Sequence, residues 1–276
     1  MTSDSPDHVA SVTRYYARNT KKFLRFGENE AYPAIHIALW PEGVERVQEA
    51  LSVAHQLVAE AIQGHATKVH KVVDLGCGMG AALGFLADHL DGAPELIGLT
   101  LGTPVPNSPH ILSGRMIIHQ ADFHQADQVV EECDVAFSIE AVAHSADLDA
   151  YLGAVSRLLR AGGMLIILDD FAVSAEAPSH WLKVYRRHWL APGVLPLDQV
   201  TALAARHGLH LTLSRDLTPW IRLGRPRDRL LQWTRPLWGW LAAFSDYAKS
   251  LSGGDARQRC LRSGETQFRM LQFTRA

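Results

Sequence analysis

The 276-residue sequence has only three cysteines, Cys77, Cys133 and Cys260, which are far apart and form no CxxC pair. Neither a disulfide framework nor a zinc site is therefore expected. The sequence also lacks an excess of one charge, since 27 basic and 29 acidic residues give a formal net charge of −2. Nothing global attracts such a chain to nucleic acid or to an anionic membrane. No uninterrupted run of ~18 apolar residues could span a membrane, and no secretory signal pattern opens the sequence, so we expect a cytoplasmic protein.

A glycine-rich segment that follows an apolar run is the most informative feature that is present, with the sequence KVVDLGCGMG at residues 71–80. It predicts a strand, a tight turn and the start of a helix. Glycine adopts positive φ and has no Cβ, so the alternation of Gly76, Gly78 and Gly80 lets the backbone turn sharply and approach a ligand closely. A plain turn between a strand and a helix rarely needs three alternating glycines. The segment therefore predicts a ligand site.

Apolar runs alternate with amphipathic stretches along most of the chain. Strands are expected at residues 71–75, 95–101, 116–120, 134–139, 164–168, 209–217 and 266–274, and helices between them at residues 81–90, 148–159 and 197–207. This alternation predicts an α/β fold with a doubly wound, mostly parallel sheet, in which ligands bind beyond the carboxyl ends of the strands. Polar residues occur at several of those ends, namely Asp74, Thr100, Asp122, Glu140, Asp169 and Asp170.

Segments rich in aromatic and basic residues flank this core. Amphipathic helices are expected at residues 8–26 and 44–63, with a break at 27–33, and prolines at 104–109 indicate an irregular connection. Four parts are expected: an N-terminal helical lid with a flanking helix (1–66), the core with a cap helix at about 175–195 (67–217), an insertion in the substrate cap (218–263) and the last core strand (264–276).

Two classes of cofactor bind at a glycine-rich first turn in such a sheet. Dinucleotides require GxGxxG and usually an acidic residue ~20 residues further on. Here the spacing is GxGxG, and the second strand ends at residues 98–101 without an acid. Residues 73–80 instead resemble motif I of the class I S-adenosylmethionine-dependent methyltransferases. The resemblance continues through residues 121–123, at that family's adenine side, and through the turn after a helix at residues 158–165.

Within this superfamily, the chain resembles the branch of sterol, tocopherol and cyclopropane fatty acid methyltransferases and related isoprenoid C-methyltransferases. Residues 98–101 are similar to its GxTxS segment, with Gly102 in place of the serine, residues 138–144 to its ExxxH segment, and residues 15–16 and 23–27 to its amino-terminal lid. The resemblance implies a seven-stranded Rossmann-like methyltransferase sheet with a helical cap or lid, and S-adenosylmethionine as cofactor. The cofactor-binding residues that it implies are Tyr16, Asp74, Gly76, Cys77, Gly78, Gly80, Thr100, Leu101, Asp122, Phe123 and Ile139.

The residues that would act on a methyl acceptor are inferred from their positions. Methyl transfer depends on positioning the acceptor, and a base is needed only where a proton must leave. Asp170 is the first candidate base, followed by Glu140 and His144, although capping or packing would also explain Asp170 and His144. The aromatic residues of the cap segments could stabilise a cation, although core packing would also explain them. The arginines between them could bind an anionic headgroup, although a solvated basic face would also explain them. The candidate substrate-binding residues are Trp40, Trp181, Tyr185, Arg186, Arg187, His188, Arg222 and Arg225.

The function expected from these residues is methyl transfer to a small, largely apolar molecule. We expect C-methylation of an isoprenoid, for example a prenyl diphosphate, through a carbocation that a carboxylate deprotonates. The alternatives are O- or N-methylation of another small natural product and a non-enzymatic cofactor-binding subunit. No metal-binding residues are predicted, but a divalent metal such as Mg²⁺ would be expected to accompany a diphosphate. A homo-oligomer is left open, and no nucleic-acid partner is expected.

Overall fold

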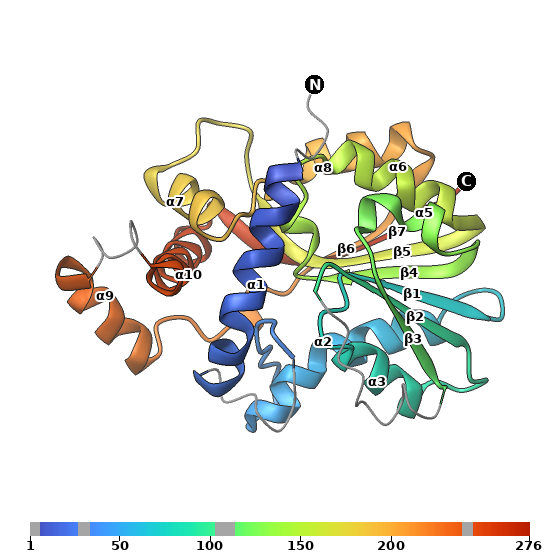
Figure 1. Ribbon diagram of the computed structural model, residues 1–276, viewed down its shortest axis with the longest axis horizontal. Coiled ribbons are helices and arrows are strands. Elements are labelled where there is room, and N and C mark those ends of the chain that lie inside the picture. The colour runs from blue at the N-terminus through green and yellow to red at the C-terminus, as the bar shows by residue number, and fades with distance from the viewer. Residues whose placement is uncertain (1–5, 27–33, 103–113, 239–244) are drawn as a thin grey trace.

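A computed structural model describes residues 6–26, 34–102, 114–238 and 245–276 of this chain. Its described strands form one seven-stranded sheet with the spatial order β3-β2-β1-β4-β5-β7-β6 (Figure 1). Their bounds are β1 (Lys71–Leu75), β2 (Glu95–Thr100), β3 (Met116–Gln120), β4 (Cys133–Ile139), β5 (Leu159–Ala172), β6 (Leu209–Asp216) and β7 (Thr266–Arg275). Strand β7 is antiparallel to both β5 and β6, and the other pairs are parallel. The predicted α/β class and seven-stranded sheet are confirmed.

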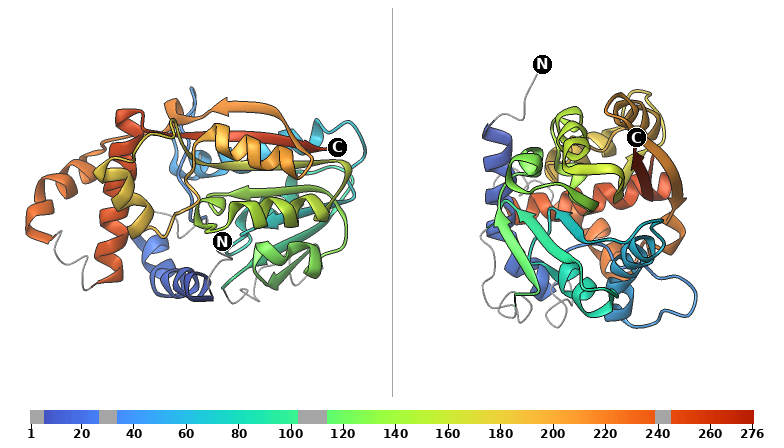
Figure 2. Two further views of the ribbon diagram at one scale, coloured as in Figure 1. Left: turned by 90° about the horizontal axis from the view of Figure 1, so that it is seen from above. Right: turned by 90° about the vertical axis from the view of Figure 1, so that its right-hand side faces the viewer.

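Helices cover both faces of the sheet, as Figures 1 and 2 show. On one face lie α2 (Val47–Gln63) and α3 (Ala81–His89), and on the other α5 (Ala126–Val129), α6 (Leu148–Leu158) and α8 (Leu197–Arg206). Each face of the sheet has its own hydrophobic core, and strand β1 contributes to both. Val72 packs in the core of the first face, and Val73 and Leu75 pack in the core of the second. Burial on both faces explains why this strand reads as a continuous apolar run.

The remaining helices lie beyond the carboxyl ends of the parallel strands, and we call them the cap (Figures 1 and 2). They are α1 (Pro6–Phe26), α7 (His180–His188), α9 (Pro226–Trp238) and α10 (Asp246–Ser263). A third apolar cluster, with Leu182 and Tyr185 on α7 and Ala256 and Cys260 on α10, joins two of them. No helix among the described residues is long and apolar enough to cross a membrane.

Two sequence predictions about elements need correction. The fifth strand, expected at residues 164–168, runs from Leu159 to Ala172, because β7 pairs with it as far as Ala172. The helix expected from residue 174 to 196 is the shorter α7, which begins after Ser179, whose side chain accepts a hydrogen bond from Leu182 N. Pro178 and Pro192 limit its extension, since proline breaks helix interiors. The predicted break at 27–33 and irregular connection at 104–109 lie outside the described residues.

Candidate active site

The glycine turn, residues 76–80, joins β1 to α3 and has the backbone that only glycine adopts readily. Gly76, Gly78 and Gly80 have φ values of 100°, 54° and 80°. A Cβ on Gly76 would lie 2.4 Å from the Cβ of Ala141, so a side chain there would collide with the segment after β4. The amides of Gly76 and Cys77 both donate to Leu99 O, which fixes the turn against β2. The turn thus brings bare backbone to the amino end of α3, where an anionic or polar ligand group is favoured.

Neighbouring strand ends add the other predicted cofactor contacts. Thr100 Oγ1 accepts from Gly102 N at 3.3 Å. Asp122 Oδ1 accepts from both His124 N and His124 Nδ1, at 3.0 and 2.7 Å. Burial alone would raise the pKa of Asp122, but these hydrogen bonds outweigh it and lower the pKa, so the carboxylate stays ionised.

The remaining predicted cofactor residues lie along the same edge of the sheet. Phe123 packs edge-on against Tyr151 with ring centroids 5.2 Å apart. Leu101 and Ile139 are half-buried at the ends of β2 and β4. Asp74 and Cys77 are buried, and burial raises the pKa of both.

The predicted carboxylates come together, but Asp170 is not beyond the end of its strand as the sequence had indicated. Asp169 and Asp170 lie inside β5, where Asp170 is opposite Phe268 of β7. Glu140 directly follows β4 and has a positive φ of 49°, which is uncommon for a residue with a side chain. Both aspartates are buried. Charged side chains inside a strand need specific partners.

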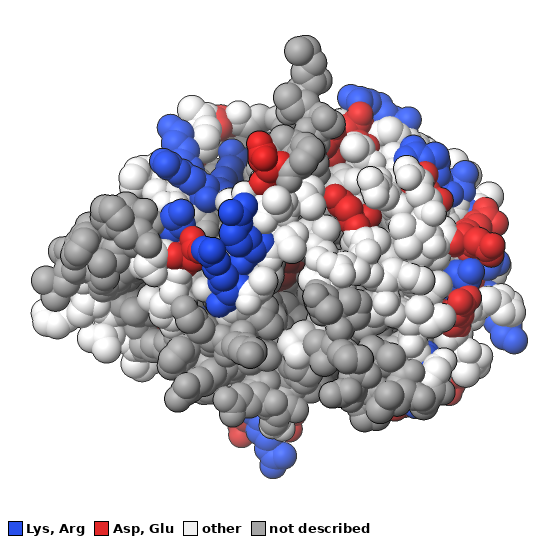
Figure 3. Space-filling view, in the orientation of Figure 1, with Lys and Arg blue, Asp and Glu red and all other residues white. Residues whose placement is uncertain are grey.

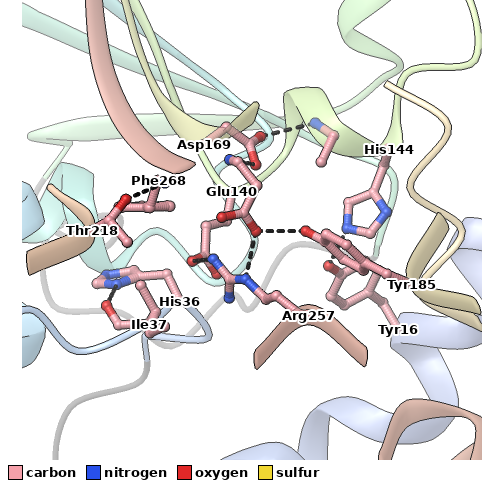
Figure 4. A network of polar contacts seen from close by, with 12 residues as sticks. Tyr16, His36, Ile37, Glu140, His144, Asp169, Tyr185, Thr218, Arg257 and Phe268 are labelled. Carbon is pink, nitrogen blue, oxygen red and sulfur yellow. Dashed lines mark hydrogen bonds and ion pairs between the residues drawn. The ribbon is translucent and has the colours of Figure 1, made fainter. Parts of the chain in front are cut away.

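Arg257 on α10 is the partner that sequence reasoning missed (Figure 4). Its Nε donates to Asp170 Oδ2 at 2.5 Å, and its Nη2 donates to Glu140 Oε1 at 2.7 Å. Tyr185 OH donates to the same Asp170 Oδ2 at 2.6 Å. Burial would lower the pKa of Arg257, but Asp170 and Glu140 raise it well above the usual value, so the guanidinium stays charged.

The two aspartates differ in what their oxygens contact. Asp169 accepts Ala143 N on Oδ2 and Asp170 N on Oδ1, both at 2.8 Å. Asp170 Oδ1 is buried and has no hydrogen-bond partner among the described residues. Burial raises the pKa of Asp169 to about 8, with a contribution from the charge of Asp170, and burial also raises the pKa of Asp170. Asp170 therefore combines a fixed orientation with one free buried oxygen.

His144 connects the cap to this site through helix α1. Its Nδ1 lies 3.0 Å from Leu190 O, so Nδ1 carries a proton and donates it. Its Nε2, 2.7 Å from Tyr16 OH, is then the acceptor of the Tyr16 hydroxyl. His8 Nε2 donates to His144 O at 2.8 Å. Burial lowers the pKa of His144, which keeps the ring neutral and its nitrogens committed to these contacts.

A pocket of about 330 Å³ lies between the strand ends and the cap. Its wall includes all three predicted catalytic residues, Asp170, Glu140 and His144, together with Tyr16. Among the predicted substrate residues, Tyr185 and Arg225 line it. The wall also includes aromatic and basic residues that were not predicted: Tyr15, His36, Trp189, Tyr247 and Arg257.

The other predicted substrate residues lie outside this lining. Arg222 stacks on Trp40, with its guanidinium carbon 3.6 Å from the ring centroid. Arg186 donates to Val194 O, which ties the end of α7 to the following loop. Trp181 carries Arg259 over its ring at 4.3 Å.

The last two residues of that prediction, Arg187 and His188, lie near the end of α7, and the Arg187 side chain is exposed. Figure 3 shows basic side chains gathered on the face of the molecule that carries α7 and α1. Within the part of the chain that the structure describes, no three His, Cys, Asp or Glu side chains cluster closely enough to hold a metal ion.

Comparison with known proteins gives concordant results. Residues 73–167 match the model of a family described as a methyltransferase domain. The 24-methylenesterol C-methyltransferase 2 of Oryza sativa subsp. japonica is 26% identical over 64% of this chain and 53% of its own length. The chloroplastic tocopherol O-methyltransferase of Arabidopsis thaliana is 32% identical over 41% of this chain and 35% of its own length. The chain thus spans about half or less of these curated relatives.

A solved structure has the same fold over the whole chain. Geranyl diphosphate C-methyltransferase from Streptomyces coelicolor A3(2), in complex with Mg²⁺, geranyl-S-thiolodiphosphate and S-adenosyl-L-homocysteine, gives a TM-score of 0.74 at 16% identity and covers 100% of both chains. The matched domain, the glycine turn and the seven-stranded sheet agree with one another. Residues 73–167 of this chain therefore form a methyltransferase domain, and the chain as a whole resembles the class I S-adenosylmethionine-dependent methyltransferases of the branch that includes the sterol and tocopherol enzymes.

Proposed function

We propose that this chain transfers the methyl group of S-adenosylmethionine to a carbon atom of a small, largely apolar isoprenoid, and that Asp170 takes up the proton that is then lost. The observation that carries this proposal is the state of Asp170 in the pocket wall. Its Oδ2 is held by Arg257 and Tyr185, while its Oδ1 has no partner among the described residues. A buried carboxylate held in this way is oriented to act as a base.

The residues around the glycine turn suit the cofactor. Gly76, Gly78 and Gly80 have no Cβ to obstruct its methionine end, and Thr100 would meet the ribose. Asp122 is ionised and fixed through one oxygen, which leaves Oδ2 to accept from the adenine side. The bound cofactor would supply an electrophilic methyl group. The chain's own task is then to hold the acceptor in line with that group and to exclude water.

The pocket wall suits a cation that forms on the acceptor when an alkene attacks the methyl group. Tyr185 and Trp189 form an aromatic pair with centroids 5.6 Å apart, and both line the pocket. Aromatic faces attract cations. One guanidinium, that of Arg257, faces the two carboxylates of Asp170 and Glu140, which leaves negative charge in excess. That excess would stabilise a developing positive charge in a site with little water.

Proton transfer to Asp170 follows from the same geometry. Burial raises its pKa, which makes the carboxylate a stronger base than a solvated aspartate. Arg257 and Tyr185 oppose this rise in pKa, because both favour the ionised carboxylate. Turnover is therefore expected to fall on acidification at a higher pH than the ordinary pKa of an aspartate would give.

The nature of the acceptor's headgroup is a separate part of the proposal. Arg225 is the predicted arginine that lines the pocket. Its Nε donates to Asp228 Oδ2 at 3.3 Å, and its side chain is 56% exposed. It is available to an anionic group at the pocket mouth, which supports a prenyl diphosphate over a free alcohol. The structural neighbour from Streptomyces coelicolor A3(2) holds a geranyl diphosphate analogue and Mg²⁺. A divalent metal would accompany a diphosphate here in the same proposal.

The test is incubation with methyl-labelled cofactor and separate acceptors: prenyl diphosphates with and without Mg²⁺, the corresponding alcohols, phenols and amines. We expect label in the isoprenoids, on carbon, as located by nuclear magnetic resonance of the product. Label only in phenols or amines would overturn carbon methylation. Label in no acceptor, from a protein that binds the cofactor in calorimetry, would favour a cofactor-binding subunit instead.

A further inference from the structure

Helix α10 has two adjacent glycines in its interior, Gly253 and Gly254, where glycine is unfavourable. Glycine loses more backbone freedom in a helix than other residues, and only proline is less suited. Helix α10 nevertheless runs without a break from Asp246 to Ser263. A specific close contact is the usual physical reason for such a residue in a helix interior.

Gly253 makes room for Trp189, which follows α7. A Cβ on Gly253 would lie 2.1 Å from Trp189 Cδ1 and 2.7 Å from Nε1, far inside van der Waals contact. Trp189 Nε1 donates to Ser250 O at 2.8 Å, on the same side of α10. The edge of the indole that carries Cδ1 and Nε1 therefore lies directly against the backbone of α10, and no residue with a side chain at position 253 would leave it in this position.

Gly254 has a different environment, because it lines the pocket itself. A Cβ there would meet one described neighbour within 4 Å, Trp189 Cζ2 at an ordinary 3.5 Å. A larger side chain at this position would therefore extend into the pocket rather than displace the wall. Trp189 also lines the pocket, with Arg257 5.4 Å from its ring centroid.

We propose that the contact of Gly253 and Gly254 with Trp189 limits the length of the acceptor chain, with Trp189 as a wall that the chain packs against and the space beside Gly254 as a part of the pocket that the chain occupies. This inference rests on the proposed function, since it takes the pocket as the acceptor site. The pocket volume of about 330 Å³ is near the lower end of small-molecule sites. In a pocket of this size, the position of the wall would limit how many isoprene units an acceptor can have.

The experiment measures binding and turnover of prenyl diphosphates of one, two and three isoprene units. Binding is measured by calorimetry with saturated analogues of the three lengths, on protein loaded with S-adenosylhomocysteine. Turnover is measured as kcat/KM with labelled cofactor. The variants are Gly254→Leu, which fills the pocket, Gly253→Ala, which displaces Trp189, and Gly254→Ala, which makes the same chemical change one residue along without a clash.

Gly254→Leu is expected to shift the preference of both binding and turnover toward the shortest chain by at least about tenfold, the discrimination that one methylene gives in an apolar pocket. Gly253→Ala is expected to shift it in the same direction and by more than Gly254→Ala does. An unchanged preference in Gly254→Leu, with cofactor affinity retained, would overturn the inference even if Gly253→Ala failed to fold.

Because binding and turnover are measured separately, a failure of this inference can be distinguished from a failure of the function on which it rests. If the wild-type protein binds the analogues but methylates none of the three acceptors, the proposed function fails and the shift in binding still decides the role of the glycines. If the wild-type protein binds none of the three lengths, both proposals are overturned.

Discussion

The proposed cofactor side and the proposed acceptor side of this protein are built in different ways. The proposed cofactor side consists mostly of short segments at the ends of β1 to β4, and the shape of its glycine turn comes from backbone geometry, such as the positive φ of Gly76, Gly78 and Gly80. The acceptor side consists of side chains from α1, β5, α7, α9 and α10, which meet only in the folded chain. Its central contact joins Arg257 to Asp170, 87 residues away in the sequence.

This difference determines how each side responds to mutation. A backbone site depends on positions where a side chain has no room or no allowed φ, so single substitutions of glycine should abolish binding. A site made of side chains loses one contribution at a time, because the remaining elements still form the wall. The predictions below test that contrast, from the largest expected effect to the smallest.

Gly78→Arg is expected to remove cofactor binding altogether. Gly78 has φ of 54° and no described atom within 4 Å of a would-be Cβ, so a long side chain would occupy the space beside the turn. Gly92→Arg is the matched control, since Gly92 has φ of 79° and equally open surroundings but lies in the turn after α3. Calorimetry with S-adenosylhomocysteine measures the effect. Equal affinity in the two variants would refute the assignment of the glycine turn.

Arg225→Gln is expected to weaken the binding of diphosphate acceptors and to leave the binding of alcohols unchanged. Hydrogen bonds to charged groups contribute about 1.5–3 kcal/mol, so KM for the diphosphate should rise about 10- to 100-fold. Arg229→Gln serves as control, since it changes an exposed arginine four residues further on, within α9, that does not line the pocket. Equal loss with alcohols and diphosphates would show that Arg225 acts through the fold rather than through a headgroup.

Asp169→Asn is expected to flatten the dependence of stability on pH. The pKa of Asp169 is raised from 3.8 to about 8 in the folded chain. Protonated Asp169 therefore stabilises the fold in acid, and the free energy of unfolding of the wild type falls as the pH rises between these two values. Each pKa unit corresponds to about 1.4 kcal/mol, so the loss amounts to a few kcal/mol. Asparagine keeps one acceptor oxygen for two backbone amides, so the variant starts less stable in acid and the difference from wild type narrows toward neutral pH. Chemical unfolding at several pH values measures this, and parallel curves would contradict it.

Much of the structure of the proposed cofactor side, its glycine turn and its strand ends, could be predicted from the sequence because the signals are local. The spacing of Gly76, Gly78 and Gly80, the apolar run before them and the polar residues after later strands all lie within short segments. Strand bounds followed from the same patterns, except for β5. Its extension to Ala172 depends on pairing with β7, about a hundred residues further on, and no local pattern near Asp170 reports that pairing.

The acceptor side could be predicted only in part. Glu140 and His144 follow β4 and Asp170 lies in the neighbouring strand β5, so their convergence was foreseeable. Arg257, in contrast, lies in an insertion with several other arginines that have the same local appearance. Trp40 and Arg222 were predicted beside the substrate but stack on each other outside the pocket lining. The adjacent glycines of α10 were the one local sign that this helix makes a close contact, and they could have directed attention to it.

The most direct test of the acceptor site compares Asp170→Asn with Asp169→Asn. The two residues are adjacent, buried and in the pocket wall, but Asp170 alone has a carboxylate oxygen without a partner among the described residues. With the isoprenoid that the wild type methylates, Asp170→Asn should lower kcat by about 10²- to 10⁴-fold, the usual contribution of a general base, and much more than Asp169→Asn does. Cofactor affinity, measured by calorimetry, should stay close to that of the wild type in both. Equal turnover in the two variants, with both folded and binding cofactor, would contradict the role of Asp170 as the base.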